Sequence, residues 1–348
     1  MADWCGGLEP ELDGQMIESR PDDPELRESA SIWLFEENGR FAFPRIGIEA
    51  VGAAWDNHRY DLNVALGGGR ILRESTTGPT HPADGGVLGA GALRFRCVEP
   101  FRKWQVSFDG NPCEGRVEDQ LRGAFGVYAG QPPKGDYPRT SLKFSAELTM
   151  AAPAWTQDYR EAALARMSEA ERVDAGLMGY GWRVEQLFRG EGEVTVDGRT
   201  ERFRCLGSRI HRQSVRPMGA FRGHCWQSAL FPDGRAFATI AYPPRDDGST
   251  YNNGYFWDGK EWLVARSVNP PFLRRLMAEG DDVSLVLETA RGQVRIGGET
   301  LLSTFHIGNP GVNGMNNQQG TVRYTLDGMT TYGMIERSSP SDLCQLVD

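Results

Sequence analysis

The sequence has no run of about 18 apolar residues, the length that a membrane-spanning helix needs, so no membrane span is expected. Basic residues are in the minority: 38 Lys and Arg stand against 47 Asp and Glu, and the formal net charge is −9. A nucleic-acid-binding surface needs a basic face, so we do not expect nucleic acid as a partner. The acidic first residues lack the basic-then-apolar order of a secretory signal.

Cysteine and histidine are also scarce, with six and five residues respectively. The cysteines form no CxxC pair and no regular disulfide framework, which predicts free thiols and a cytoplasmic protein. The histidines form no HxH or HExxH motif, so no metal site is expected. Gly67-Gly-Gly-Arg70 is predicted to be a hairpin turn, because the helix that a phosphate loop requires does not follow it. The sequence therefore predicts neither a metal nor a cofactor.

What the chain does contain is a series of short apolar runs separated by turn residues. Eight Asp-Gly pairs occur, and five of them fall between expected strands. Asp-Gly readily supplies the positive φ angles of two-residue hairpins, so the pattern predicts an antiparallel, mostly β protein. The first residues of the five pairs are Asp109, Asp197, Asp233, Asp258 and Asp327.

The length of 348 residues favours two domains, and nine Trp and 16 Phe can supply two cores. Residues 93–110 and 283–298 show a weak similarity that keeps its order, which indicates a duplicated β domain. Antiparallel sheets of this size protect their edges by closing into barrels. We expect an acidic lead segment over 1–30, a first domain over 31–178 and a second over 179–348.

Two segments have helical character. Residues 156–173 are rich in helix formers and begin at a suitable N-cap, Thr156, so they are expected to form a helix that connects the two domains. Residues 271–279 carry an apolar stripe typical of a second, short helix. Both stripes are expected to pack against a sheet.

Polar chemistry is concentrated in Cys205–Pro244, which holds two of the five histidines. Strand alternation near its centre would place Arg222, His224 and Trp226 on one face. In a barrel wide enough for a ligand, this row would line the lumen. The alternative is that Arg222 and His224 face solvent while Trp226 covers the rim.

His211 is the second histidine of this stretch, with Arg209 on its own face and Arg212 and Arg216 on the other. Nearby guanidinium groups would lower the pKa of His211 and keep its imidazole neutral, which suits a proton acceptor. An ordinary hydrogen-bonded histidine is the alternative.

Two further expected strands carry candidate site residues. Tyr332 and Glu336 share a face of one strand, and Glu336 is either a buried acid or the partner of an arginine. Trp182 is expected to line the core or the wall of a pocket.

Four segments together resemble the two halves of a lipocalin-like superfamily that includes carotenoid hydratases of the hydroxyneurosporene-synthase type. Fungal Diels–Alderases and kievitone-hydratase-like proteins share its architecture. The resemblance extends from about Ile32 to Ser338. The four segments are FPRIGIEAVGAAW, LRFRCVEPFRKWQVSFDG, FRGHCWQSALFPDGRAFATIAYPPRDDG and VRYTLDGMTTYGMIERS.

The resemblance implies an all-β fold of two consecutive lipocalin-like antiparallel β-barrels with one short connecting helix. It also implies a cavity for a terpenoid, steroid, polyketide or aromatic molecule, and chemistry without a cofactor. Many members carry the motif Arg-Asp-His-Ser-Trp-Gly-x-Arg. The matching residues 209–216 keep the arginines and the histidine but hold Ile210 in place of the acid and Gln213 in place of the tryptophan. Alkene protonation through that acid is therefore not expected.

We accordingly expect a lyase or isomerase that hydrates, dehydrates or isomerises a hydrophobic small molecule. The alternatives are a non-catalytic carrier of such a molecule and a pericyclic cyclase that works by shape. The acid–base candidates are His211, His224 and Glu336. Two arginines are expected to orient a substrate oxygen, and three aromatic residues to form apolar walls: Arg209, Arg216, Trp182, Trp226 and Tyr332.

Overall fold

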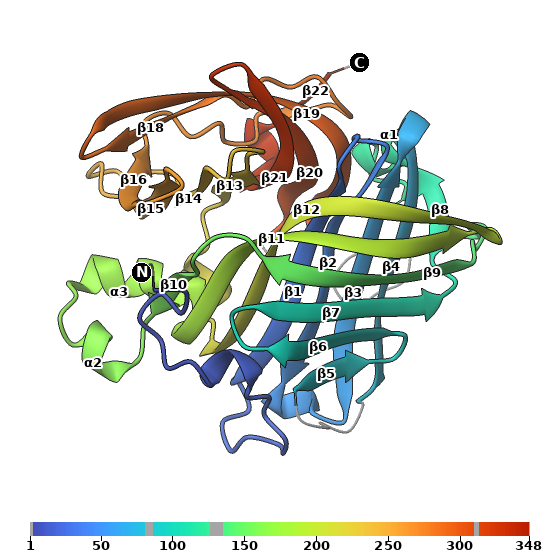
Figure 1. Cartoon of the computed structure of the whole chain (residues 1–348), viewed down its shortest axis with the longest axis horizontal. Coiled ribbons are helices and arrows are strands. Elements are labelled where there is room, and N and C mark those ends of the chain that lie inside the picture. The colour runs from blue at the N-terminus through green and yellow to red at the C-terminus, as the bar shows by residue number, and fades with distance from the viewer. Residues whose placement is uncertain (1–2, 81–85, 126–134, 310–312, 348) are drawn as a thin grey trace.

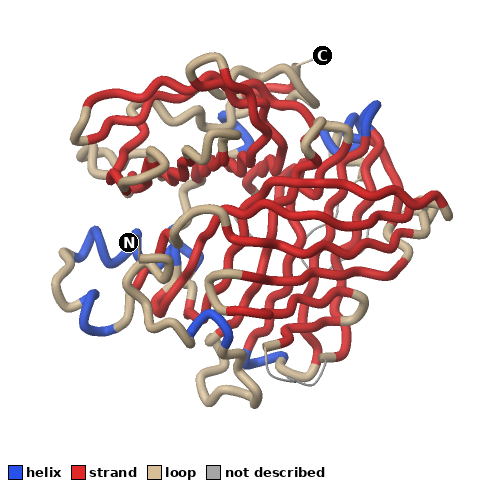
Figure 2. The backbone as a smooth tube through the Cα atoms, in the orientation of Figure 1, coloured by secondary structure: helices blue, strands red, loops and turns tan. Residues whose placement is uncertain are grey.

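The computed structural model describes residues 3–80, 86–125, 135–309 and 313–347. Strands dominate this part of the chain, while helices are few and short (Figure 2). The predicted all-β, antiparallel fold class is confirmed. In the described residues, no helix has both the length and the apolar character needed to cross a membrane. All six cysteines are free thiols, as the sequence predicts.

Twelve of the described strands form one large antiparallel sheet, in the order β5-β6-β7-β9-β11-β12-β1-β2-β3-β4-β8, with β10 paired to β11. A single bridge between Thr80 and Ala90 joins the end of β4 to β5, so the sheet curls almost into a barrel. Its strands are β1 (Arg27–Glu36), β2 (Phe41–Val51), β3 (Asn57–Leu66), β4 (Arg70–Pro79), β5 (Val87–Ala90), β6 (Leu93–Glu99), β7 (Lys103–Gly110), β8 (Cys113–Arg116), β9 (Leu142–Met150), β10 (Trp155–Asp158), β11 (Tyr180–Val196) and β12 (Arg199–Val215).

Eight later strands of the described chain close into a barrel that lies beside the large sheet (Figure 1). A small parallel sheet accompanies it, made of β17 (Arg275–Leu276) and β22 (Gln345–Leu346). The barrel strands are β13 (His224–Leu230), β14 (Ala236–Ala241), β15 (Asn252–Trp257), β16 (Trp262–Ser267), β18 (Leu285–Thr289), β19 (Gly292–Asn309), β20 (Met315–Leu326) and β21 (Met329–Ser339).

The strand pairing corrects the expected boundary between the two domains. β11 and β12 follow residue 178, yet β11 pairs with β9, and residues 205–214 of β12 pair with the whole of β1. Residues 180–215 therefore complete the large sheet rather than begin the second half. The closed barrel starts at His224, so the boundary lies between Val215 and His224.

The helix expected over 156–173 is present only in part. Trp155–Asp158 pair with β11 as β10, because alternate side chains from this segment are buried against the sheet and tertiary pairing overrides helix propensity. The helix expected over 271–279 is absent from the described chain, where β17 occupies part of that range. The helices are α1 (Val117–Leu121), α2 (Glu161–Leu164) and α3 (Glu169–Met178), with 3₁₀ segments η1 (Leu12–Gly14), η2 (Gly52–Ala54), η3 (Gly67–Gly69), η4 (Met218–Ala220) and η6 (Ser341–Leu343).

Four of the five Asp-Gly pairs lie in turns between consecutive strands, as predicted. In the β11–β12 and β20–β21 hairpins, both residues of the pair have positive φ angles: 51° and 77° at Asp197-Gly198, and 50° and 79° at Asp327-Gly328. The prediction is wrong for Asp109-Gly110, which ends β7 and pairs with β9.

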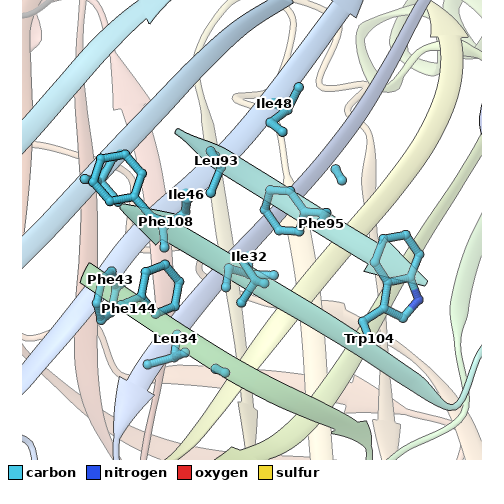
Figure 3. Packing of buried hydrophobic residues seen from close by; sticks show 14 of the residues in the cluster. Ile32, Leu34, Phe43, Ile46, Ile48, Leu93, Phe95, Trp104, Phe108 and Phe144 are labelled. Carbon is cyan, nitrogen blue, oxygen red and sulfur yellow. The ribbon is translucent and has the colours of Figure 1, made fainter. Parts of the chain in front are cut away.

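Three of the five hydrophobic clusters in the described chain account for the sheet, the barrel and the junction between them. The first fills the inside of the curled sheet, where Ile32 and Leu34 of β1 lie opposite aromatic side chains such as Phe95 and Phe108 (Figure 3). A second fills the barrel with side chains from all eight of its strands. The third joins the outer face of the sheet, through Trp33 and its neighbours, to the outside of the barrel. Both interiors are packed with side chains.

Candidate functional site

A cavity of about 270 Å³ lies between the outer face of the large sheet and the barrel. This volume is slightly below the ~300–1,000 Å³ that small-molecule sites usually occupy. Alternate residues of a strand point to opposite faces, so Ser31 and Trp33 of β1 reach the cavity while Ile32 points into the core. Strands β13, β14, β20 and β21 supply the opposite wall.

A row of polar residues crosses five neighbouring strands on the sheet side of this cavity. Arg183 of β11 lies opposite Arg212 of β12, and Arg212 lies opposite Ser29 of β1. Ser29 lies opposite Glu49 of β2, which in turn lies opposite Arg59 of β3. A polar row on the outside of a sheet is ordinary when water covers it, but here the barrel covers it. It therefore needs partners within the protein or in a ligand.

On the barrel side, a histidine, a serine and a glutamate form a connected group on two adjacent strands. His224 of β13 lies directly opposite Ser338 of β21, and Trp226 lies opposite Glu336. His224 Nδ1 is 2.8 Å from Ser338 Oγ, and His224 Nε2 is 3.3 Å from Glu336 Oε1. All three residues border the cavity. The antiparallel register therefore holds an acid–base group in place without a loop.

The charge on Glu336 determines the direction of these hydrogen bonds. Burial raises the pKa of Glu336, but the hydrogen bond and charge of His224, together with the charge of Arg45, lower it to about 2. Gln319 also donates a 2.7 Å hydrogen bond to Glu336 Oε2. An ionised carboxylate can only accept, so His224 Nε2 carries the proton that it shares with Glu336. In the neutral imidazole, Nδ1 is then free to accept the hydroxyl proton of Ser338.

Two tryptophans form an apolar wall beside this group. The rings of Trp33 and Trp226 meet edge to face, with centroids 4.8 Å apart. Trp226 Nε1 donates a 3.2 Å hydrogen bond to Glu185, a fully buried residue that also accepts from Arg183 at 3.0 Å. Burial raises the pKa of Glu185. The ring contact with Trp33 and the hydrogen bond to Glu185 therefore both hold the indole of Trp226 in place.

The structure brings together four of the eight residues proposed from sequence: Arg216, His224, Trp226 and Glu336 all border the cavity. Of the predicted row Arg222, His224 and Trp226, the last two border the cavity, while Arg222 pairs with Asp174. His224 and Trp226 face neither the barrel lumen nor bulk solvent, which corrects both sequence-based alternatives. The lumen is filled by the second hydrophobic cluster, and the other face of β13 points into it through Ala229. The row lies on the outside of the barrel, against the large sheet.

His211 and Arg209 lie on the inner face of the sheet, away from the cavity. His211 Nε2 is 2.9 Å from Glu28 Oε1, and Arg209 makes two 2.7 Å hydrogen bonds to Asp13. Trp182 packs edge-on against the His211 ring, with centroids 5.0 Å apart. These residues form a buried cluster, and none of the three borders the cavity.

The expected lowering of the His211 pKa is wrong. Burial lowers the pKa of His211, but the hydrogen bonds and charges of Asp13 and Glu28 raise it by more than burial lowers it. The pKa of His211 therefore lies above its ordinary value. Burial also opposes ionisation of Asp13, yet Arg209 and His211 hold the pKa of that carboxyl well below its usual range. Carboxylates from the start of the chain, rather than the neighbouring arginines, set the environment of His211.

Tyr332 also lies outside the cavity lining. Its ring packs over Gly39 in the β1–β2 turn, where a Cβ atom would approach the ring to 2.8 Å. This tyrosine therefore contributes to the contact between sheet and barrel and not to the ligand wall.

The model of one protein family matches residues 12–341, nearly the whole chain, and its description is "Domain of unknown function (DUF7064)". The chain belongs to the DUF7064 family. No curated protein matches it.

Solved structures that resemble this DUF7064 protein share its fold at low sequence identity. A protein from Nitrosomonas europaea assigned as AttH matches with 12% identity and a TM-score of 0.56, covering 96% of this chain and 100% of its own. CghA in complex with Sch210972 matches with 12% identity and a TM-score of 0.56, covering 92% and 89%. Kievitone hydratase from Nectria haematococca gives a TM-score of 0.46 at 11% identity, covering 90% and 88%. The first two likenesses show that this chain shares the fold of those two proteins.

Sequence reasoning missed the sheet side of the DUF7064 cavity. Arg45, Glu49, Arg59 and Asp61 border it, yet they were not singled out. Their signal was a charge at alternate positions of strands β2 and β3, which normally indicates a solvated face. In the described part of the chain, no group of three or more His, Cys, Asp or Glu side chains is arranged to hold a metal ion.

Proposed function

We propose that this DUF7064 protein is an enzyme that transfers a proton within a small, largely apolar molecule bound between the sheet and the barrel. His224 is the base and acid, Ser338 passes the proton, and Glu336 stabilises the imidazolium. The reaction class is dehydration, hydration or isomerisation. The observation that carries this proposal is the connected Ser338–His224–Glu336 group beside the Trp33–Trp226 wall.

The hydrogen-bond directions give a balanced sequence of steps. A proton on the substrate carbon beside a carbonyl moves to Ser338 Oγ while the hydroxyl proton of Ser338 moves to His224 Nδ1, and the bonding electrons stay on the substrate as an enolate. The imidazolium then carries a positive charge next to ionised Glu336. In a dehydration, the same proton goes back through Ser338 to the leaving hydroxyl, which departs as water. In an isomerisation it goes to another carbon atom.

The fold likeness supports a cavity of this kind without fixing the substrate. CghA, which shares the fold, was solved in complex with Sch210972. The cavity of the present chain combines two indoles and Ile240 with a polar floor. A molecule with an apolar body and at least one oxygen matches that combination.

Hydrogen–deuterium exchange tests the proposal even where the net reaction is unknown. Native mass spectrometry would identify a small molecule that stays bound through purification, and that molecule would be incubated with the protein in D₂O. We expect deuterium incorporation or conversion with the wild type. His224→Gln should reduce its rate by roughly 10²–10⁴-fold, the usual contribution of positioned acid–base catalysis.

His58→Gln is the matched control, because His58 is a buried histidine that packs against Trp55 and lies outside the cavity lining. Its exchange rate should equal that of the wild type. Bound ligand without exchange or conversion in the wild type would identify a carrier instead. Conversion that survives His224→Gln but is lost in Trp226→Leu would identify shape-driven pericyclic catalysis.

A further inference from the structure

Positive charge exceeds negative charge in the lining of the cavity. Among the described residues, six arginines but only three carboxylates border it. The whole chain has the opposite balance, with a net charge of −9. Burying a guanidinium without a partner is costly, because the charge loses its hydration. The local excess therefore needs an explanation beyond the general composition of the protein.

A single carboxylate, that of Glu49, pairs with three of these six arginines. Glu49 lies 2.5 Å from Arg59 Nη2, 3.4 Å from Arg27 Nη1 and 3.5 Å from Arg212 Nη2. Burial raises the pKa of Glu49, but the charges of Arg59, Arg212, Arg27 and Arg45 outweigh it and keep the carboxyl ionised. One negative charge cannot neutralise three or four guanidinium groups. Arg59 has Asp61 as a second partner, while Arg27 and Arg212 depend on Glu49.

Two other cavity arginines have weaker partners. Arg216 donates to the carbonyl of Leu177 at 2.6 and 3.0 Å, and it forms no ion pair with a carboxylate in the described chain. Arg45 Nε is buried without a hydrogen-bond partner among the same residues. The Arg45 guanidinium lies 6.0 Å from the Trp33 ring, so it borders the apolar wall.

The arginines also act on one another. Burial lowers the pKa of Arg212, and the charge of Arg216 lowers it further. Arg183 stands directly opposite Arg212 across the strand pair, an arrangement that destabilises a sheet when both charges are unpaired. The charge of Arg183 is balanced by its ion pair with Glu185. Among the described residues, Arg212, whose side chain is 9% exposed, has Ser29 and the shared Glu49 as its side-chain partners.

We propose that the cavity binds a molecule whose apolar body carries an acidic group, and that Arg27, Arg45, Arg212 and Arg216 receive this group. A carboxylate there would supply the missing negative charge through charge-assisted hydrogen bonds. The apolar body would lie along Trp33 and Trp226, with its reactive carbon toward Ser338. This inference rests on the proposed function, which makes the cavity the substrate site. It adds the chemical class of the substrate.

The test compares probes that share a naphthalene body and carry a negative, a neutral or a positive group of similar size. Binding of naphthalene-2-carboxylate, naphthalene-2-carboxamide and 2-naphthylmethylamine to the wild type would be measured by calorimetry. We expect the carboxylate to bind roughly 10- to 100-fold more tightly than the carboxamide, as the loss of charged hydrogen bonds implies. The amine should bind most weakly. Equal dissociation constants for carboxylate and carboxamide would overturn the proposal.

Variants locate the acid-binding group within the cavity. Arg216→Gln and Arg45→Gln should each reduce the preference for the carboxylate several-fold while leaving carboxamide binding nearly unchanged. Both are partly exposed positions, so folding should survive, and circular dichroism would verify it. Arg199→Gln is the matched control, because Arg199 begins the same strand as Arg212 but is exposed at its far end.

A carboxylate preference that persists unchanged in both cavity variants would contradict the assignment of the site. The experiment measures binding in the absence of turnover. A failure of deuterium exchange therefore leaves it unaffected, and an absent charge preference leaves the acid–base proposal standing.

Discussion

At the scale of single residues, the two buried groups that contain His224 and His211 have different surroundings. His224 and Glu336 border a cavity and leave a serine hydroxyl available to a ligand. His211 is enclosed by two carboxylates and two tryptophan rings on the inner face of the sheet. The first arrangement suits chemistry. The second ties the start of the chain to β12.

The cluster around His211 should make folding stability depend on pH. Because carboxylates raise the folded-state pKa of His211 above its unfolded value of about 6.5, its charge stabilises the fold fully below that value. The stabilisation is lost as the pH rises through the folded-state pKa. We therefore expect the difference in unfolding free energy between the wild type and His211→Gln to be larger at pH 6 than at pH 9.

Urea denaturation of both proteins at several pH values would measure this difference. The charged groups that face His211 are Asp13 and Glu28, with Arg209 bound to Asp13. A difference that stays constant between pH 6 and pH 9 would show that His211 does not change its protonation on folding. A loss of turnover in His211→Gln beyond the unfolded fraction would favour the role that the sequence motif implies.

At the scale of elements, hairpins set the register of both sheets. The pair Asp327-Gly328 connects the long strands β20 and β21, and β21 carries Glu336 and Ser338 to the cavity. Both turn residues have positive φ angles, at which a Cβ atom is unfavourable. The turn chemistry therefore contributes to the position of the acid–base group.

Gly328→Ala should lower the unfolding free energy by about 1 kcal/mol, because alanine resists the left-handed conformation. A Cβ at Gly328 would meet no atom within 4 Å, so the effect would come from the backbone alone. Gly219→Ala is the control, since its Cβ also meets nothing within 4 Å and its φ angle is not positive. Equal stability of the two variants in thermal denaturation would refute the backbone explanation.

Much of the fold was accessible from sequence because its signals are local. Asp-Gly pairs and apolar alternation predict antiparallel strands without knowledge of their partners. The helix predicted over 156–173 is wrong at its start, because the first residues of that segment form β10. The pairing of β10 with β11 depends on tertiary structure, which the local sequence does not encode. The domain boundary was misplaced for the same reason, since only the partners of β11 and β12 assign them to the large sheet.

Only half of the site residues predicted from the sequence border the cavity. The alternation of side chains along β13 correctly places His224 and Trp226 on one face of the strand. It cannot show that this face packs against the large sheet. The partners of His211 come from Asp13 and Glu28, far away in the sequence, so the direction of its pKa could not be inferred from neighbours. The cytoplasmic location stays a prediction.

At the scale of the whole molecule, the third hydrophobic cluster joins the sheet and the barrel and encloses the cavity between them. Trp33 of β1 and Trp226 of β13 are in direct contact across this junction. The two bodies should therefore be energetically coupled and not independent domains that share a linker.

A double-mutant cycle would measure that coupling. We expect Trp33→Leu and Trp226→Leu to be non-additive by about 0.5–1.5 kcal/mol in unfolding free energy, the usual contribution of an edge-to-face aromatic pair. Trp33→Leu with Phe95→Leu is the control cycle, because Phe95 lies in the core on the inner face of the sheet. Additive effects in both cycles would show that sheet and barrel are not coupled through this contact.

The place of the β11–β12 hairpin has a consequence for how the protein is made. This hairpin lies between β9 and β1, so it joins two smaller sheets into one. During translation, before the residues after α3 have been synthesised, each of those two sheets has an unpaired edge strand. Unpaired edge strands are the usual template for aggregation. The barrel, in contrast, forms from strands that follow one another in a single later stretch. The nascent first half is thus the state in which a chaperone would matter most.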